Sequence, residues 1–109
     1  MSIQSTLSFL LDTLMEQLAH ANLYSEQPPT TAQLASSEPF AVDTMRFEQW
    51  LQFVFVPKLR QMIEESQALP KAIAILPMAE QTFFARNIDA PMVLSTLAKI
   101  DALLSGQHA

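Results

Sequence analysis

A single glycine, Gly106, occurs among the 109 residues of this chain. Tight β-hairpin turns place glycine at positive φ, so a sheet built from hairpins is disfavoured. Phosphate-binding loops of the Walker or dinucleotide type need several glycines, so both are excluded. The chain therefore has to fold from elements that need little glycine, and the spacing of its apolar residues indicates helices.

Two stretches carry apolar residues at steps of three and four, which is the spacing of one helical face. The first predicts a helix over about residues 3–23. The second predicts a helix with Asp89 as N-cap and Pro91 in its first turn, ending near Ser105 before Gly106. The two apolar stripes consist of Ile3, Leu7, Leu10, Leu11, Leu14, Leu18 and Ala21, and of Met92, Val93, Leu97, Ile100, Leu103 and Leu104.

Between them, a further helix is predicted from Asp43 to about Ser66. Asp43 has the side chain of an N-cap, and Val42 before it has the spacing to pack on Phe47 in a hydrophobic staple. Pro57 lies inside this helix. Because proline lacks an N–H and its ring clashes with the preceding turn, we expect a kink or a break there.

This middle helix is apolar on more than one side. Phe47 and Trp50 share one face, and aromatic residues at helical spacing belong more often to a core than to a binding surface. Phe53 and Val56 project away from that face by helical geometry. We therefore expect Phe53 and Val56, with Trp50 beside them, to form a protein interface or a contact between two copies of the chain.

Residues 24–42 form a long connection with three prolines. Consecutive Pro28 and Pro29 favour an extended path, and connections of this length are usually functional or disordered. We expect Leu34 and Phe40 to attach it to the core.

A second connector, residues 69–77, is apolar and bracketed by prolines, so we expect it to be buried. Pro77 is well placed in the first turn of a short helix that runs to about Ala85, where its missing N–H costs nothing. These elements predict an all-α fold: one domain over residues 1–109, a four-helix up-and-down bundle with a kinked central helix and a long proline-containing loop after the first helix.

Charge and composition narrow the function. The net charge is −5, and the six Lys and Arg residues are scattered, which disfavours direct binding of nucleic acid or anionic membranes. The absence of cysteine excludes disulfides, thiolate nucleophiles and zinc–sulfur sites. No Lys or Arg precedes Arg46 as in a signal peptide, and the densest apolar run, residues 50–57, is far shorter than a membrane span. We expect a cytoplasmic protein.

Residues that carry catalytic or metal chemistry are sparse. Glu16 and His20 share a helical face, but no second histidine-bearing helix would complete a di-iron site, so a solvated pair is expected. Glu80, flanked by Pro77 and Phe83, is the best candidate for a general acid–base carboxylate. The simpler interpretation is an exposed carboxylate in the first turn of its helix. No Gly-x-Ser-x-Gly motif occurs. We expect no catalytic, metal or cofactor-binding residues and no enzyme activity.

Two functions remain open. The first is a non-catalytic interaction module that binds a protein partner and also self-associates through the middle helix. The alternative is a small-molecule-binding bundle, because six methionines and a kinked helix make an irregular core that can hold a ligand. The candidate pocket of that alternative is lined by Pro57, Pro77 and Glu80.

Four short motifs follow one another along the chain: Pro39-Phe40-x-x-Asp43-Thr44-Met45, Trp50-Leu51-Gln52-x-Val54-x-x-Pro57, Leu69-Pro70 and Pro77-x-x-Glu80. This ordered set resembles the YqcC-like family of small bacterial domains and covers essentially the whole chain. Gln49 departs from the pattern, which has an acidic residue before the tryptophan. The resemblance implies a small all-helical domain whose gene often neighbours that of a tRNA pseudouridine synthase, and it supplies no catalytic residues.

Overall fold

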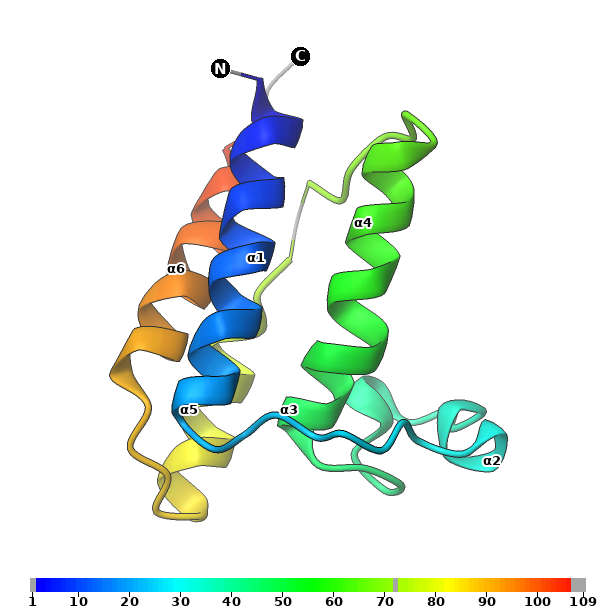
Figure 1. Ribbon diagram of the computed structural model, residues 1–109, viewed down its shortest axis with the longest axis vertical. Coiled ribbons are helices and arrows are strands. Elements are labelled where there is room, and N and C mark those ends of the chain that lie inside the picture. Colours follow the sequence, from blue (N-terminus) through cyan, green and yellow to red (C-terminus); the bar gives the residue numbers. More distant parts are fainter. Residues whose placement is uncertain (1, 72, 107–109) are drawn as a thin grey trace.

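The computed structural model describes residues 2–71 and 73–106, and every regular element within these ranges is helical. Four long helical stretches run alternately down and up the molecule, which confirms the predicted all-α, up-and-down arrangement (Figure 1). α1 packs beside α6, and α5 packs on α6. No helix in these ranges is both long and apolar enough to cross a membrane. The elements are α1 (Ile3–His20), α2 (Thr31–Leu34), the 3₁₀ turn η1 (Pro39–Ala41), the continuous α3 (Phe47–Trp50), η2 (Leu51–Phe55) and α4 (Val56–Glu64), then α5 (Ile75–Ala85) and α6 (Pro91–Ser105).

Three of the helices are followed by a residue whose backbone is in the left-handed region, and none of these residues is glycine. Asn22, Ser66 and Asn87 have φ values of 59°, 54° and 55°. In each case the next residue's N–H donates to the carbonyl five residues earlier at 2.8 Å, which satisfies an otherwise unpaired carbonyl of the last turn. Asparagine tolerates this conformation better than most residues do. Because of this ending, the first helix stops at His20, slightly before the predicted residue 23.

The prediction that Asp43 caps the middle helix is wrong. The helix begins at Phe47, with Arg46 as its N-cap residue. Asp43 instead accepts a hydrogen bond from a serine hydroxyl of the preceding loop. Val42 is 58% exposed, so it forms no staple with Phe47. The physical reason is that residues 40 and 41 both adopt positive φ, so the chain turns before the helix starts.

Pro57 follows a π-helical segment, η2 (Leu51–Phe55), rather than a break in the helix. The Val56 N–H donates to the carbonyl of Leu51, five residues back. A π turn inserts one extra residue, so the positions after it rotate by roughly one residue around the helix. Val56 consequently faces the core and is 2% exposed, so the prediction that it projects outward is wrong. Phe53, within η2, is half-buried.

The connector between α4 and α5 is buried only in part, because Lys71 and Ala74 are exposed, so the prediction of a buried connector is only partly confirmed. Leu69 is buried at its start and Ile75 at its end. Asp101 of α6 accepts hydrogen bonds from the N–H groups of Ile75 and the next residue, at 3.1 and 2.8 Å. This carboxylate satisfies donors that the first turn of α5 leaves unpaired. Pro77 lies in that first turn, as predicted.

α6 has the predicted length but a different cap. It begins at Pro91, and the N-cap position is held by buried Ala90, so the prediction of Asp89 as N-cap is wrong. The helix ends at Ser105 with Gly106 following it, as predicted.

The long connection after α1 contains short helical turns and is attached by polar contacts. The capping pair of Thr30 and Gln33 starts α2, with bonds of 2.8 and 3.1 Å. The Gln33 amide donates to the Thr44 carbonyl at 2.9 Å, and the Thr44 hydroxyl donates to the Gln33 carbonyl at 2.8 Å. Leu34 is 48% exposed, so the prediction that it attaches the loop to the core is wrong.

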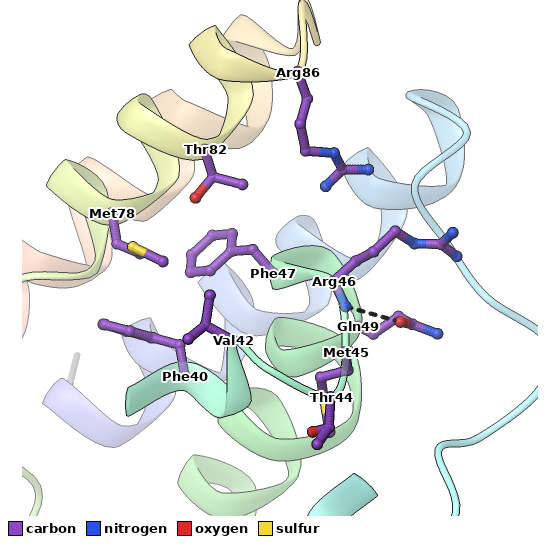
Figure 2. A pocket seen from close by; sticks show the side chains of 10 residues that line it. All are labelled: Phe40, Val42, Thr44, Met45, Arg46, Phe47, Gln49, Met78, Thr82 and Arg86. Atoms are coloured by element: carbon purple, nitrogen blue, oxygen red, sulfur yellow. Dashed lines mark hydrogen bonds between the residues drawn. The ribbon is translucent and has the colours of Figure 1, made fainter. Parts of the chain in front are cut away.

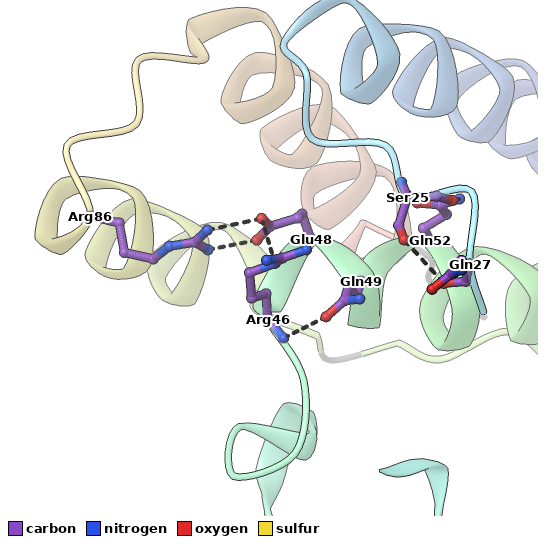
Figure 3. Close-up of polar contacts among 7 residues, drawn as sticks. All are labelled: Ser25, Gln27, Arg46, Glu48, Gln49, Gln52 and Arg86. Atoms are coloured by element: carbon purple, nitrogen blue, oxygen red, sulfur yellow. Dashed lines mark hydrogen bonds and ion pairs between the residues drawn. The ribbon is translucent and has the colours of Figure 1, made fainter. Parts of the chain in front are cut away.

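Gln52 fixes the start of this connection to the middle helix (Figure 3). Its side chain is buried, and its Nε2 donates to the Ser25 carbonyl at 2.7 Å. Its Oε1 accepts from the Ser25 N–H at 2.8 Å. Both polar groups of one peptide residue are therefore satisfied by one side chain, as buried polar groups require.

We expect Gln52→Ala to lower the free energy of unfolding by about 1–3 kcal/mol, because it leaves the two Ser25 backbone groups without their partner. Urea denaturation followed by circular dichroism measures this loss. Gln81→Ala is the matched control: Gln81 is exposed on α5, and its replacement should change stability by less than about 0.5 kcal/mol. Equal effects of the two substitutions would show that the Gln52 pairing contributes nothing.

Candidate binding hollow

The predicted pocket between Pro57, the connector of residues 69–77 and Glu80 does not form among the residues that the structure describes. Pro57, Pro77 and Glu80 are all exposed. None of them lines any of the three main surface hollows found in the described part of the chain. Glu80 is exposed, as the simpler interpretation predicted, but α5 begins at Ile75, so the prediction that Glu80 lies in the first turn is wrong.

The predicted interface residues divide between core and surface. Trp50 is half-buried and packs on the core, with its ring centroid 4.9 Å from that of Phe40 and 5.4 Å from that of Phe55. Val56 is buried and cannot reach a partner without unfolding. Phe53, half-buried on η2, is the remaining candidate of the three for a contact between chains.

An ion cluster of Arg46, Glu48 and Arg86 joins α3 to the end of α5. Glu48 is 4% exposed, and its two carboxylate oxygens accept from the two terminal nitrogens of Arg86 at 2.6 and 3.0 Å (Figure 3). The Nε of Arg46 lies 3.5 Å from the same carboxylate. A fork of two parallel bonds is the strongest geometry that a guanidinium and a carboxylate adopt. The pair therefore ties together two helices that are distant in the sequence.

The Glu48 carboxylate remains ionised in this position. Burial opposes its charge and is the largest single effect on its pKa. The hydrogen bonds from Arg86 and from the backbone, with the attraction of Arg86 and Arg46, together outweigh burial and hold the pKa of Glu48 below its usual value. The same bond raises the pKa of Arg86. One carboxylate thus serves two guanidiniums, which leaves one positive charge in excess at the cluster.

A surface hollow of about 450 Å³ lies beside this cluster, between α5 and the turn that leads into α3 (Figure 2). Met78 and Thr82 of α5, and Arg86 at its C-cap, are spaced at steps of four and so lie on one face. Figure 2 shows both guanidiniums at one end of the hollow and apolar side chains at the other. The lining residues are Phe40, Val42, Thr44, Met45, Arg46, Phe47, Gln49, Met78, Thr82 and Arg86.

Aromatic rings form the base of this hollow. Phe47 is buried, and its ring lies edge-on to Phe40 at 5.9 Å and to Phe83 at 6.1 Å. Phe40 has a φ of 58°, which costs an ordinary residue of order 1–3 kcal/mol. Its ring contacts with Phe47 and Trp50 offset that cost and attach the long connection to the core, as predicted for Phe40.

The lining suits binding better than chemistry. It contains two guanidiniums, one amide, two threonine hydroxyls and apolar groups, and no histidine or carboxylate that would act as a general acid or base. The Thr44 hydroxyl is already engaged with the Gln33 carbonyl. Across the described residues, no three His, Asp or Glu side chains gather as a metal site.

Sequence reasoning missed Arg46, Glu48 and Arg86. Glu48 follows Phe47 and precedes Leu51 by three positions, which places a carboxylate on the buried face of the helix. That position was the available signal, because a buried charge needs a partner. Nothing local indicates which cation serves it, since Arg86 lies 38 residues further along the chain.

The comparisons with known proteins support this fold and point to one family. The sequence profile described as "DUF446: tRNA pseudouridine synthase C" matches residues 6–103. The solution NMR structure of protein YqcC from E. coli superimposes with a TM-score of 0.88 at 28% identity, covering 100% of this chain and 93% of that one.

Two relatives of similar length have names that state no activity. An uncharacterized protein of Haemophilus influenzae is 36% identical over 98 residues, 90% of this chain and 92% of its own length. The uncharacterized protein YqcC of Escherichia coli K12 is 30% identical over 95 residues, which are 87% of this chain and 84% of that protein.

A tRNA pseudouridine synthase C of Pectobacterium carotovorum is 42% identical over 45 residues, which are 41% of this chain and 12% of that protein.

We expect Glu48→Gln to lower the free energy of unfolding at pH 7 by about 1–3 kcal/mol, because the amide cannot neutralise the two arginines. A carboxylate with a depressed pKa stabilises the fold above its ordinary pKa of 4.5, and this contribution is lost as the pH falls through the folded value. The difference between wild type and variant should therefore shrink as the pH falls below 4.5.

Urea denaturation at pH 7 and at successively lower pH measures both effects. Glu64→Gln serves as the control, because Glu64 is exposed at the end of α4. A Glu48→Gln deficit that stays constant with pH would mean that the charge of Glu48 does not stabilise the fold.

Proposed function

The chain belongs to the DUF446 family, and on that premise we propose that it is a non-catalytic helical module that binds a tRNA pseudouridine synthase. The proposal concerns a protein–protein contact in the cytoplasm and assigns no reaction to the chain itself.

The observation that carries the proposal is that a segment similar to part of this chain occurs within the same polypeptide as a tRNA pseudouridine synthase. A segment similar to 45 residues of this chain makes up 12% of a protein named tRNA pseudouridine synthase C. Joining two modules in one chain turns their contact into an intramolecular one with a high effective concentration, so such joining is favoured for modules that work together. The description of the family names the same synthase.

The charge and the hollow both favour a protein partner over RNA. A chain of net charge −5 lacks the cations that neutralise phosphates, so a link to tRNA chemistry runs through the synthase. The arginine-rimmed hollow has an aromatic base and no acid–base group in its lining, which suits docking. Phe, Met and Arg, which all line the hollow, are enriched in protein interfaces relative to the rest of the surface.

We expect this chain and the tRNA pseudouridine synthase C of the same organism to sediment together as a species heavier than either protein alone. Sedimentation velocity at about 10 μM detects a complex with a Kd of about 1 μM, since most of each protein is then bound. An acidic helical protein of the same size, unrelated in sequence, is the control. Independent sedimentation of the two proteins at this concentration would remove the synthase as partner and favour a small-molecule ligand.

Self-association is proposed through Phe53 alone, because Val56 is buried. We expect Phe53→Asp to make the chain monomeric at concentrations where the wild type forms dimers, since it places a charge in an apolar contact. Phe84→Asp introduces the same charge at an 85% exposed position on α5 and should leave the assembly unchanged. A wild-type chain that sediments as a monomer at high concentration would contradict the proposal.

A further inference from the structure

The two ends of the hollow differ in chemistry. Met78, Phe40 and Val42 lie at one end, and Arg46 and Arg86 at the other (Figure 2). We propose that the hollow docks a short segment of the partner protein in which an apolar side chain is followed by Asp or Glu. The inference rests on the proposed protein-binding function and names the chemistry of the segment that is bound.

Charge complementarity supports a carboxylate at the arginine end. Glu48 neutralises one of the two guanidiniums and leaves a net positive charge in a chain of net charge −5. The Arg46 side chain is 61% exposed, and its Nε lies 3.5 Å from the Glu48 carboxylate, well beyond the Arg86 bonds of 2.6 and 3.0 Å. Its terminal nitrogens can therefore donate to a second carboxylate, and a guanidinium fork matches that group in shape and charge.

An apolar side chain suits the other end. Val42 is 58% exposed at the rim, while Phe40 and Met78 are half-buried beside it. Covering these side chains removes apolar surface from water, which favours binding. Methionine adapts its shape to an incoming group, and a volume of about 450 Å³ falls in the usual range of binding pockets.

Phosphates of RNA fit the hollow less well than such a segment. A nucleic-acid site needs several cations along a backbone path, and this lining supplies two arginines, one of them paired with Glu48 by two hydrogen bonds. Half of the lining is apolar and would be left unused. The observations therefore favour a protein segment over RNA.

Random twelve-residue peptides displayed on phage, selected against the full chain, provide a probe that does not depend on the synthase. We expect enrichment of peptides with an apolar residue next to Asp or Glu. Calorimetric titration should show binding that is weakened roughly tenfold or more by Val42→Asp and by Arg46→Glu, because each places a negative charge against the acidic segment. Added salt should weaken binding as well.

Two matched variants control for charge alone. Leu34→Asp alters an apolar residue that is 48% exposed in the same connection, outside the hollow. Arg60→Glu alters an exposed arginine that is also in one ion pair, with Asp12 at 2.7 Å. Both should bind the selected peptides as the wild type does. If Arg46→Glu lowers the unfolding midpoint, Arg46→Gln takes its place.

The outcomes separate this inference from the proposed function. Any of four results would overturn the inference. Selection could yield peptides without a common motif, or basic peptides. The two hollow variants could leave peptide binding unchanged, or the chain could bind tRNA in a way that depends on Arg46. A synthase complex that survives both hollow variants would keep the partner and place its contact elsewhere. Peptide binding in the hollow without a synthase complex would keep the inference and replace the partner.

Discussion

One buried carboxylate organises the part of the molecule that contains the candidate binding hollow. Glu48 lies on the core face of α3, where an unpaired charge would be strongly destabilising. Its partner Arg86 comes from the C-terminal end of α5, so the need to pair this charge fixes α5 against α3. The hollow between them follows from that constraint. Because Arg46 approaches the same carboxylate, its guanidinium lies at the rim as well.

The long connection illustrates a second way of ordering a chain with few turn-forming residues. It has no glycine, and its one well-packed apolar anchor, Phe40, requires a left-handed backbone. Hydrogen bonds between side chains and backbone order the remainder of the connection: Gln52 pairs with Ser25, and Gln33 and Thr44 each donate to the other's carbonyl. Such bonds satisfy the backbone of a connection that forms no long helix, and so they hold the wall of the hollow in place.

The spacing of apolar residues predicted the long helices, but it indicated neither the short helix α2 within the long connection nor how the faces of the helices are used. The stripes of α1 and α6 were correct because an uninterrupted α-helix turns by a constant angle per residue. The prediction that Val56 projects outward was wrong because the π segment before Pro57 adds a residue to one turn. No sequence pattern indicated that segment. The Glu48–Arg86 pair joins residues 38 positions apart, so only the packed fold reveals it. The prediction of a pocket at Pro57, Pro77 and Glu80 was wrong for the same reason, because the position of a hollow depends on how the helices pack against one another.

The selectivity that we propose for the hollow comes from the contrast between overall and local charge. A net charge of −5 repels polyanions at long range, so RNA is disfavoured before contact. Close to the hollow, two arginines share one carboxylate, and the excess positive charge attracts an acidic group that can approach within hydrogen-bonding distance. A short protein segment with one or two carboxylates carries too little charge to be repelled as RNA is, and it brings the apolar side chain that the opposite end accommodates. In the docking that we propose, a negative overall charge and a positive local charge together select a protein segment, although neither would select it alone.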